Sequence, residues 1–136
     1  MASNAVVLDS GALSALAETK KPARFAVRFA LRQALKSGAD VLVPTVVIAE
    51  STTGDSRLDA NVNRTLKALT LVDLDERIAR NAAALRFANR TRRSGTVDAI
   101  VVATADRVPG SCVLTADPND LRPLAAVADR TTIVPL

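Results

Sequence analysis

The sequence predicts an α/β fold in which helices cover both faces of an open, mostly parallel sheet. Short apolar runs alternate with longer helical patterns along its 136 residues, and such alternation is typical of parallel β-α-β units. The apolar runs are rich in valine, leucine and isoleucine with little polar alternation, as expected for strands buried on both faces. No repeat or flexible linker interrupts the pattern, so we expect a single domain over residues 1–136.

Five segments have the length and composition of buried strands. They are Ala5–Leu8, Val41–Val43, Leu69–Leu74, Cys112–Thr115 and Thr132–Val134. Helical patterns fill the intervals between them. These helical segments are Gly11–Glu18, Pro22–Lys36, Thr45–Thr52, Leu58–Leu69, Asp75–Arg92, Thr96–Arg107 and Pro118–Ala128. The order predicts a five-stranded central sheet between two layers of helices.

Local signals support several of these helix boundaries. Pro22 suits the first turn of a helix, and Gly38 suits the residue after a helix end. Asp117 is expected to cap a helix that begins at Pro118. The Thr45–Thr52 helix is the weakest of the set, because its valines and isoleucine are poor helix formers.

The segment Thr96–Ala105 is apolar on every face of a helix, which predicts a buried helix. Ala99 and Ala103 are four residues apart and would let such a helix approach a sheet closely. Ile100–Val102 also suits a strand, but the length and alanine content favour a helix. Asp98, the one charge, then lies in the first turn, where the helix dipole favours an anion.

Composition excludes several enzyme classes. The chain has no histidine and one cysteine, which excludes Ser-His-Asp and Cys-His catalysis, histidine-containing zinc sites and an intramolecular disulfide. The net charge of +4 fits a polyanionic partner such as nucleic acid, but it fits ordinary surface charge as well. The first residues lack a signal-peptide pattern, and the longest apolar stretch is well short of the roughly 20 residues of a membrane helix. We expect a cytoplasmic protein that does not contact a membrane.

Four carboxylates stand in otherwise apolar surroundings. Asp9 follows VVL, Glu50 ends VLVPTVVIAE, Asp98 lies within TVDAIVVATA and Asp117 follows CVLTA. A buried carboxylate must be paired, neutralised or bound to a metal. Strand ends and helix starts place all four at the carboxyl edge of a parallel sheet, where binding sites form. Two anions about 5 Å apart repel by about 3 kcal/mol at an effective dielectric constant of 20, so several such pairs require a cation.

A donor set of oxygen atoms without histidine or cysteine favours Mg²⁺ or Mn²⁺ over zinc. A hard cation of this kind suits phosphoryl chemistry. Each carboxylate also has a purely structural interpretation. Asp9 and Asp117 suit helix caps, Asp98 suits a helix dipole and Glu50 suits an ion pair with an arginine. The four together favour a metal site.

These residues resemble the motifs of PIN-domain ribonucleases, specifically the VapC toxins of bacterial toxin–antitoxin pairs. The resemblance rests on VVLDSGAL, PTVVIAE, TVDAIVVATA and VLTADPNDL, and it covers nearly all of the chain. It implies a PIN-like three-layer α/β/α sandwich and an endoribonuclease that depends on Mg²⁺ or Mn²⁺ and hydrolyses RNA with an activated water. It also implies a VapB-type antitoxin and a toxin homodimer.

The resemblance assigns roles residue by residue. Asp9, Glu50, Asp98 and Asp117 match the family's four acidic residues in order, as catalytic and metal-binding groups, with Asp9 and Asp98 the surest metal ligands.

Supporting residues follow from the same resemblance. Thr115 and Asp120 match the hydroxyl and the trailing aspartate of the family's T-x-D-x-x-D ending, although Asp120 also suits an ordinary first helical turn. Many relatives have a hydroxyl residue where this chain has Gly11, and Ser10 is the candidate to replace it.

Two groups of basic residues recur at helical spacing. The first group is Arg24, Arg28, Arg32 and Lys36, and the second is Arg86, Arg90 and Arg93, with Arg92 close by. Either group suits an RNA backbone, and a solvated helix face explains each equally well. Phe25 and Phe29 adjoin the first group; a place in the core is favoured over a groove for a partner peptide.

Two other functions fit the predicted fold. One is a PIN-like module that binds RNA or protein without cleavage, which the presence of all four acids disfavours. The other is a different metal-dependent phosphohydrolase on a doubly wound sheet. The lack of a D-x-D-x-T/V motif after the first strand disfavours its commonest aspartate-phosphatase version.

Overall fold

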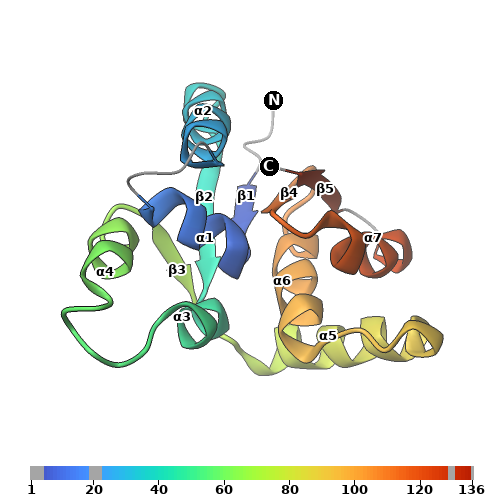
Figure 1. The fold of residues 1–136 in the computed structure, drawn as a ribbon. Helices are drawn as coiled ribbons and strands as arrows, with labels where there is room; N and C mark the ends of the chain where they lie inside the picture. The colour runs from blue at the N-terminus through green and yellow to red at the C-terminus, as the bar shows by residue number, and fades with distance from the viewer. Residues whose placement is uncertain (1–4, 19–22, 129–130, 136) are drawn as a thin grey trace.

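The computed structural model describes residues 5–18, 23–128 and 131–135, with the side chains of residues 23 and 24 excepted (Figure 1). The prediction that a helix starts at Pro22 lies outside these residues. In the described residues, five strands form one sheet. They are β1 (Ala5–Leu8), β2 (Asp40–Pro44), β3 (Thr70–Val72), β4 (Cys112–Thr115) and β5 (Thr132–Pro135).

The sheet has the strand order β3-β2-β1-β4-β5, and every neighbouring pair is parallel. The helices are α1 (Ser10–Ala17), α2 (Ala23–Lys36), α3 (Thr45–Ser51), α4 (Ala60–Leu66), α5 (Glu76–Ala88), α6 (Thr96–Asp106) and α7 (Pro118–Val127), with the 3₁₀ helix η1 (Arg90–Arg92). The chain adds β2 and β3 on one side of β1 and β4 and β5 on the other, so right-handed connections place the helices on opposite faces. Accordingly α1 packs against α2, α3 and α4, whereas α6 packs against α5 and α7 (Figure 1). The predicted three-layer α/β/α sandwich is confirmed.

Helix α6 is the central helix of its layer. It packs on β1, β2 and β4, and every residue from Ala99 to Ala105 is buried. Ala99 and Ala103 are fully buried, as their small size predicts for a helix lying close against a sheet. The helix interpretation of this segment is confirmed, and it fixes Asp98 at the end of a rigid element.

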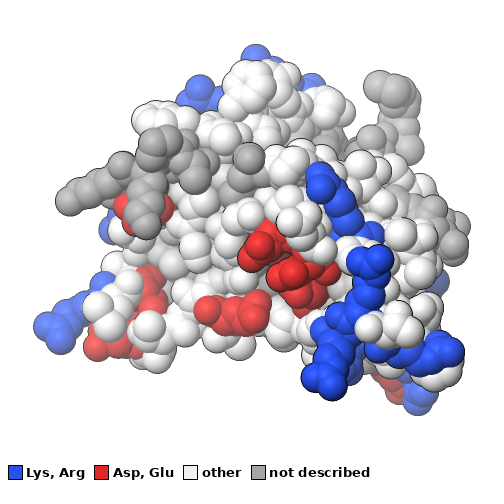
Figure 2. Space-filling view, turned by 45° about the vertical axis from the view of Figure 1, so that its right-hand side comes forward, with Lys and Arg blue, Asp and Glu red and all other residues white. Residues whose placement is uncertain are grey.

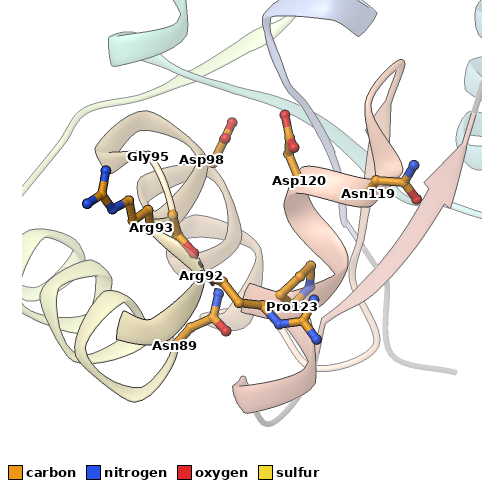
Figure 3. Close-up of a pocket in the computed structure, with 9 residues that line it drawn as sticks. Asn89, Arg92, Arg93, Gly95, Asp98, Asn119, Asp120 and Pro123 are labelled. Carbon is orange, nitrogen blue, oxygen red and sulfur yellow. Dashed lines mark hydrogen bonds between the residues drawn. The ribbon is translucent and has the colours of Figure 1, made fainter.

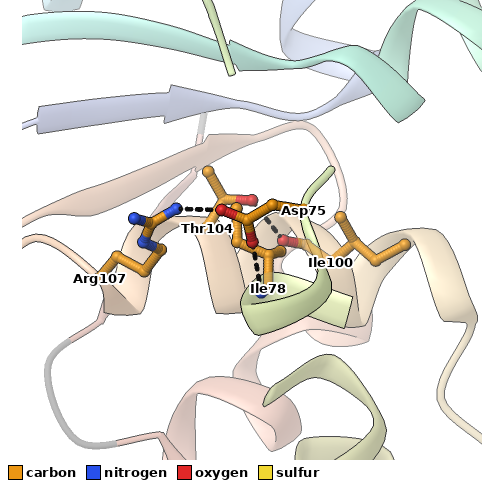
Figure 4. Close-up of polar contacts among 5 residues, drawn as sticks. All are labelled: Asp75, Ile78, Ile100, Thr104 and Arg107. Atoms are coloured by element: carbon orange, nitrogen blue, oxygen red, sulfur yellow. Dashed lines mark hydrogen bonds and ion pairs between the residues drawn. The ribbon is translucent and has the colours of Figure 1, made fainter. Parts of the chain in front are cut away.

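A polar clamp joins the start of α5 to the end of α6 (Figure 4). Asp75 caps α5 by accepting a 2.8 Å hydrogen bond from the Ile78 amide, and Arg107 Nη1 lies 3.1 Å from its other oxygen. Beside it, the Thr104 hydroxyl donates to the Ile100 carbonyl within α6. These contacts hold α5 against α6 at the end remote from Asp98.

Two expectations about the helices are wrong. The helix predicted over Asp75–Arg92 ends at Ala88, and the chain continues through η1 to Arg93, whose φ of 50° is left-handed. Phe25 and Phe29 do not lie in the core, because their side chains are 72% and 66% exposed on α2. Their apolar face is not covered by any other described part of the chain.

Among the described residues, no helix combines the length and the apolar composition that a membrane crossing needs.

Candidate active site

The site lies at the point where the connections of the sheet change direction. From β1 the chain proceeds to β2 on one side, and after β3 it returns to β4 on the other. The carboxyl ends of β1 and β4 therefore flank a crevice of the kind in which α/β sheets bind ligands. Asp9 directly follows β1, Thr115 ends β4, and Asp117 lies two residues beyond.

Asp9 is buried, with 8% of its surface exposed, and both carboxylate oxygens have partners. One oxygen accepts a 2.8 Å hydrogen bond from the Ala12 amide, so Asp9 caps α1 as its structural interpretation predicted. The other accepts a hydrogen bond from the Thr115 hydroxyl. The Thr115 oxygen in turn accepts a 2.8 Å hydrogen bond from the Asp117 amide. Thr115 thus links the ends of β1 and β4 and orients the Asp9 carboxylate.

Asp98 lies in the first turn of α6 and is half-buried. Its pKa is raised to about 6, mainly by burial and then by the nearby carboxylates of Asp120, Glu50, Asp9 and Asp117, in that order. No basic side chain is among the main influences on this pKa. The five carboxylates therefore share one electrostatic environment that the protein's own cations leave largely uncompensated.

The pKa of Asp9 is also raised, mainly by burial. The hydrogen bonds from Thr115 and Ala12 oppose this shift, while the charges of Asp117 and Glu50 add to it. Perturbed carboxylates that crowd one crevice are typical of functional sites.

The other predicted acids lie around this pair. Glu50 is exposed near the end of α3 and makes no ion pair within the described residues, which does not support the alternative of an arginine partner. Asp117 precedes α7 as predicted, but its side chain makes no capping hydrogen bond, so that part of the prediction is wrong. Asp120 is exposed in the first turn of α7 and is the strongest charged neighbour of Asp98.

The donor chemistry of this crevice fits a hard divalent cation, because it offers carboxylate oxygens whose charges are mutually repulsive. The side chains do not form a closed set of ligands. Within the described residues, no three acidic or cysteine side chains are placed so that together they could hold a metal ion. The structure thus brings the negative charges together, and the assignment of Asp9, Asp98, Asp117 and Glu50 as ligands stays a prediction.

Gly11 has a steric reason to lack a side chain. A Cβ atom built on it would lie 2.9 Å from the Cβ of Ala116 and 3.6 Å from Asp9 Oδ1. The first turn of α1 and the chain after β4 therefore pack too closely for a hydroxyl residue at position 11. Ser10 is half-buried as the first residue of α1, and its replacement of that hydroxyl stays a prediction.

Basic side chains lie next to the acidic side chains on the face of the molecule shown in Figure 2. Arg86, Arg90 and Arg93 do not lie on one helical stripe, because α5 ends before Arg90. They nevertheless line one hollow of about 410 Å³ with Ser94. The α2 group differs: Arg28, Arg32 and Lys36 are exposed on the helix, and the side chain of Arg24 is outside the described residues.

Sequence reasoning missed a pocket of about 400 Å³ next to Asp98 (Figure 3). It is lined by Asn89, Arg92, Arg93, Ser94, Gly95, Asp98, Asn119, Asp120 and Pro123. Its only sequence signal was the polar, arginine-rich segment RTRRSG directly before the buried helix. The helix was expected to continue to Arg92, and this hid the turn after Ala88 that forms the pocket.

The fold and the acidic crevice define an α/β sandwich with a carboxylate-rich site at the switch point of its sheet. The chain belongs to the PIN domain family, whose model matches residues 6–127. This confirms the family that its motifs resemble. No curated protein matches the chain.

Solved structures of VapBC proteins share the fold. VapBC2 from Rickettsia felis, bound to a DNA fragment from its promoter, has a TM-score of 0.73 at 11% identity, covering 96% of this chain and 98% of that one. DNA-bound VapBC from Salmonella typhimurium has a TM-score of 0.70 at 16% identity, with the same coverage of 96% and 98%. VapBC-5 from Mycobacterium tuberculosis, described as a member of the VapBC family of toxin–antitoxin systems, has 0.61 at 23% identity, covering 97% and 98%.

Proposed function

We propose that the protein is a cytoplasmic VapC-type toxin, an endoribonuclease that requires Mg²⁺ or Mn²⁺ and is neutralised by a VapB-type antitoxin. Membership of the PIN family and the VapBC structural neighbours support this class. The observation that carries the proposal is the environment of Asp98. Four other carboxylates raise its pKa, and no basic side chain of the protein is a main opposing influence. A divalent cation would relieve this repulsion.

Asp9 and Asp98 are the proposed principal ligands, and Glu50 and Asp117 complete the set directly or through water. When bound, the cation would activate water and stabilise negative charge that develops on a phosphodiester. Thr115 holds the Asp9 carboxylate in its orientation, so that this ligand is fixed before substrate arrives. Asp120 adds negative charge beside Asp98 and would help to retain the cation.

The antitoxin would dock on α2. Phe25 and Phe29 are exposed there, and with Arg28 and Arg32 they line a hollow of about 300 Å³. Apolar side chains next to two arginines suit an amphipathic segment with acidic residues. This is the peptide-groove role that the sequence left as the alternative for the two phenylalanines. A toxin homodimer also stays part of the proposal, and sedimentation of the purified chain tests it.

The test of the proposed activity is incubation of the purified protein with total RNA, with Mn²⁺ or Mg²⁺ and with a chelator, beside the Asp98→Asn variant. We expect metal-dependent cleavage that the variant lacks. Cleavage that persists with chelator or in the variant would exclude the proposed metal-dependent nuclease. RNA binding without cleavage would favour the binding module. Growth arrest on expression, absent for the variant, would separate a toxin from a housekeeping nuclease.

A further inference from the structure

The pocket beside Asp98 carries both signs of charge. It lies between the 89–95 loop and the starts of α6 and α7. Asp98 and Asp120 point in the same direction on one side of it, and Arg92 extends toward Pro123 (Figure 3). Arg93 lines this pocket and also the neighbouring hollow with Arg86 and Arg90. A continuous basic surface therefore adjoins the acidic centre.

The loop that carries Arg92 and Arg93 is held in place by its own contacts. Asn89 Nδ2 donates a 2.6 Å hydrogen bond to Ser94 Oγ, and Arg86 Nε donates to the Ser94 carbonyl at 3.2 Å. The Arg92 amide donates to the Asn89 carbonyl at 3.0 Å. Because these contacts fix the loop before a ligand arrives, its backbone needs little reordering on binding.

The side chains of Arg92 and Arg93 differ from those of the neighbouring arginines in having no contact of this kind within the described residues. Arg86 donates a hydrogen bond to the loop. Arg90 lies 4.4 Å from the Phe87 ring centroid and donates a hydrogen bond to the Phe87 carbonyl. Within the described residues, Arg92 and Arg93 make no side-chain hydrogen bond or ion pair, and neither is a main influence on the pKa of Asp98. Their guanidinium groups remain available to an anionic ligand, and a phosphate matches their planar geometry.

We propose that Arg92 and Arg93, whose side chains extend in opposite directions in Figure 3, form a subsite that binds two backbone phosphates of single-stranded RNA next to the bond to be cut. This inference rests on the proposed function. The pocket has no aromatic lining residue, so recognition there depends on phosphate rather than on base stacking. Both arginines act as positioning residues: they place the strand across the acidic crevice, where the carboxylates alone would repel it.

The experiment compares two double variants that remove the same charge. Arg92→Gln/Arg93→Gln alters the subsite, and Arg57→Gln/Arg64→Gln is the control, since Arg57 and Arg64 are exposed in the α3–α4 connection and on α4, in the opposite helix layer. Fluorescence anisotropy measures the Kd of a labelled single-stranded RNA in chelator, so that cleavage does not interfere. Titrations at several salt concentrations give the slope of log K against log salt.

The subsite variant should weaken RNA binding about tenfold or more. It should also reduce the magnitude of the salt slope by about 1.4, the value for two phosphate contacts on a single strand. The control should leave the slope unchanged. Arg92→Lys should keep the slope, because it keeps the charge, while losing affinity. In cleavage assays the subsite variant should raise KM with little change in kcat.

Equal losses in both double variants, or an unchanged slope in the subsite variant, would overturn the inference. Thermal melting tests whether both variants are folded, and we expect both to be, because the four side chains are exposed. The outcomes separate the two proposals. RNA binding that depends on Arg92 and Arg93 without any metal-dependent cleavage would reject the nuclease and keep the subsite. Cleavage with KM and salt slope independent of these residues would reject the subsite and keep the nuclease.

Discussion

Asp9 and Asp75 are both N-cap residues, of α1 and α5, but the charged groups around them differ. Each precedes a helix with extended backbone and accepts a 2.8 Å hydrogen bond from the amide three residues on. Asp75 has Arg107 beside its other oxygen (Figure 4), and its pKa is lowered, first by the capping hydrogen bond. Asp9 is buried near other carboxylates, and its pKa is raised.

The comparison separates a structural carboxylate from a candidate functional one. The capping hydrogen bond is common to both, so it does not identify a site. The two regions differ in whether a basic side chain balances the negative charge. Arg107 forms an ion pair with Asp75, whereas no basic side chain has a comparable influence on the pKa of Asp9 or Asp98. A carboxylate whose ionised form the fold disfavours is a group that a bound cation would stabilise, and perturbed carboxylates of this kind are typical of functional sites.

The largest expected difference between the two regions is in activity. Asp9→Asn should reduce metal-dependent RNA cleavage by about 100-fold or more, because it removes a proposed ligand charge. Asn is as good a helix cap as Asp, so α1 should persist. Asp75→Asn is the matched control and should cleave RNA at the wild-type rate. Initial rates of the folded variants test this, and equal losses in the two would remove the distinction.

Metal affinity should depend on pH through Asp98. Its pKa of about 6 means that a proton competes with the cation below that value. We expect the affinity for Mn²⁺ to rise about tenfold between pH 5 and pH 7, because ionised Asp98 becomes about tenfold more abundant. Calorimetric titration at the two pH values measures the change.

A matched variant sharpens that measurement. Glu50→Gln removes a charge that raises the pKa of Asp98, so the midpoint of the pH dependence should move down, while the affinity at pH 7 decreases. A Mn²⁺ affinity that is flat with pH would contradict the assignment of Asp98 as a ligand.

The acidic crevice could be predicted from sequence because its members interrupt apolar runs. Asp98 is the only charge in the apolar segment Thr96–Ala105, most of which is buried, and Asp9 directly follows a buried strand. The exposure of Phe25 could not be predicted, since an apolar residue on an amphipathic helix has the same pattern whether its own chain or a partner covers it. The arginine pocket depends on a helix end at Ala88 and a left-handed Arg93. The left-handed position is occupied by an arginine, and the nearest glycine, Gly95, comes two residues later, so the pattern does not mark that turn.

The close packing at Gly11 should have a measurable effect on stability. Alanine normally favours a helix over glycine by about 1 kcal/mol, but here its Cβ would lie 2.9 Å from that of Ala116. We expect Gly11→Ala to destabilise the protein by about 1–3 kcal/mol, as overpacking does, measured by urea unfolding. In the Ala116→Gly background the clash is gone, so the same change should be neutral or stabilising. Equal effects in both backgrounds would show that packing is not the cause.

The smallest expected effect is on thermal stability: removal of the Asp75 carboxylate and removal of the Asp98 carboxylate should change the Tm in opposite directions. In the metal-free protein, the pKa of Asp75 is lowered from 3.8, so its ionised form stabilises the fold above that pH and the benefit is lost as the pH falls through the lowered pKa. The pKa of Asp98 is raised to about 6, so its stabilising contribution is complete below 3.8 and is lost as the pH rises through 6.

At pH 7, Asp75→Ala should therefore lower the Tm and Asp98→Asn should raise it. The Asp98 difference should shrink as the pH falls to about 4, where Asp98 is protonated in the folded and, increasingly, the unfolded protein. The Asp75 difference should persist at pH 4 and be lost only at lower pH, as the pH falls through the lowered pKa of Asp75. Saturating Mn²⁺ should reverse the Asp98 result, because only the wild-type chain keeps the full ligand set and gains stability from binding. Melting curves at pH 4 and 7, with and without the metal, distinguish these cases. If Asp98→Asn lowered the Tm at pH 7 in chelator, the Asp98 charge would be compensated within the fold, and the contrast with Asp75 would fail.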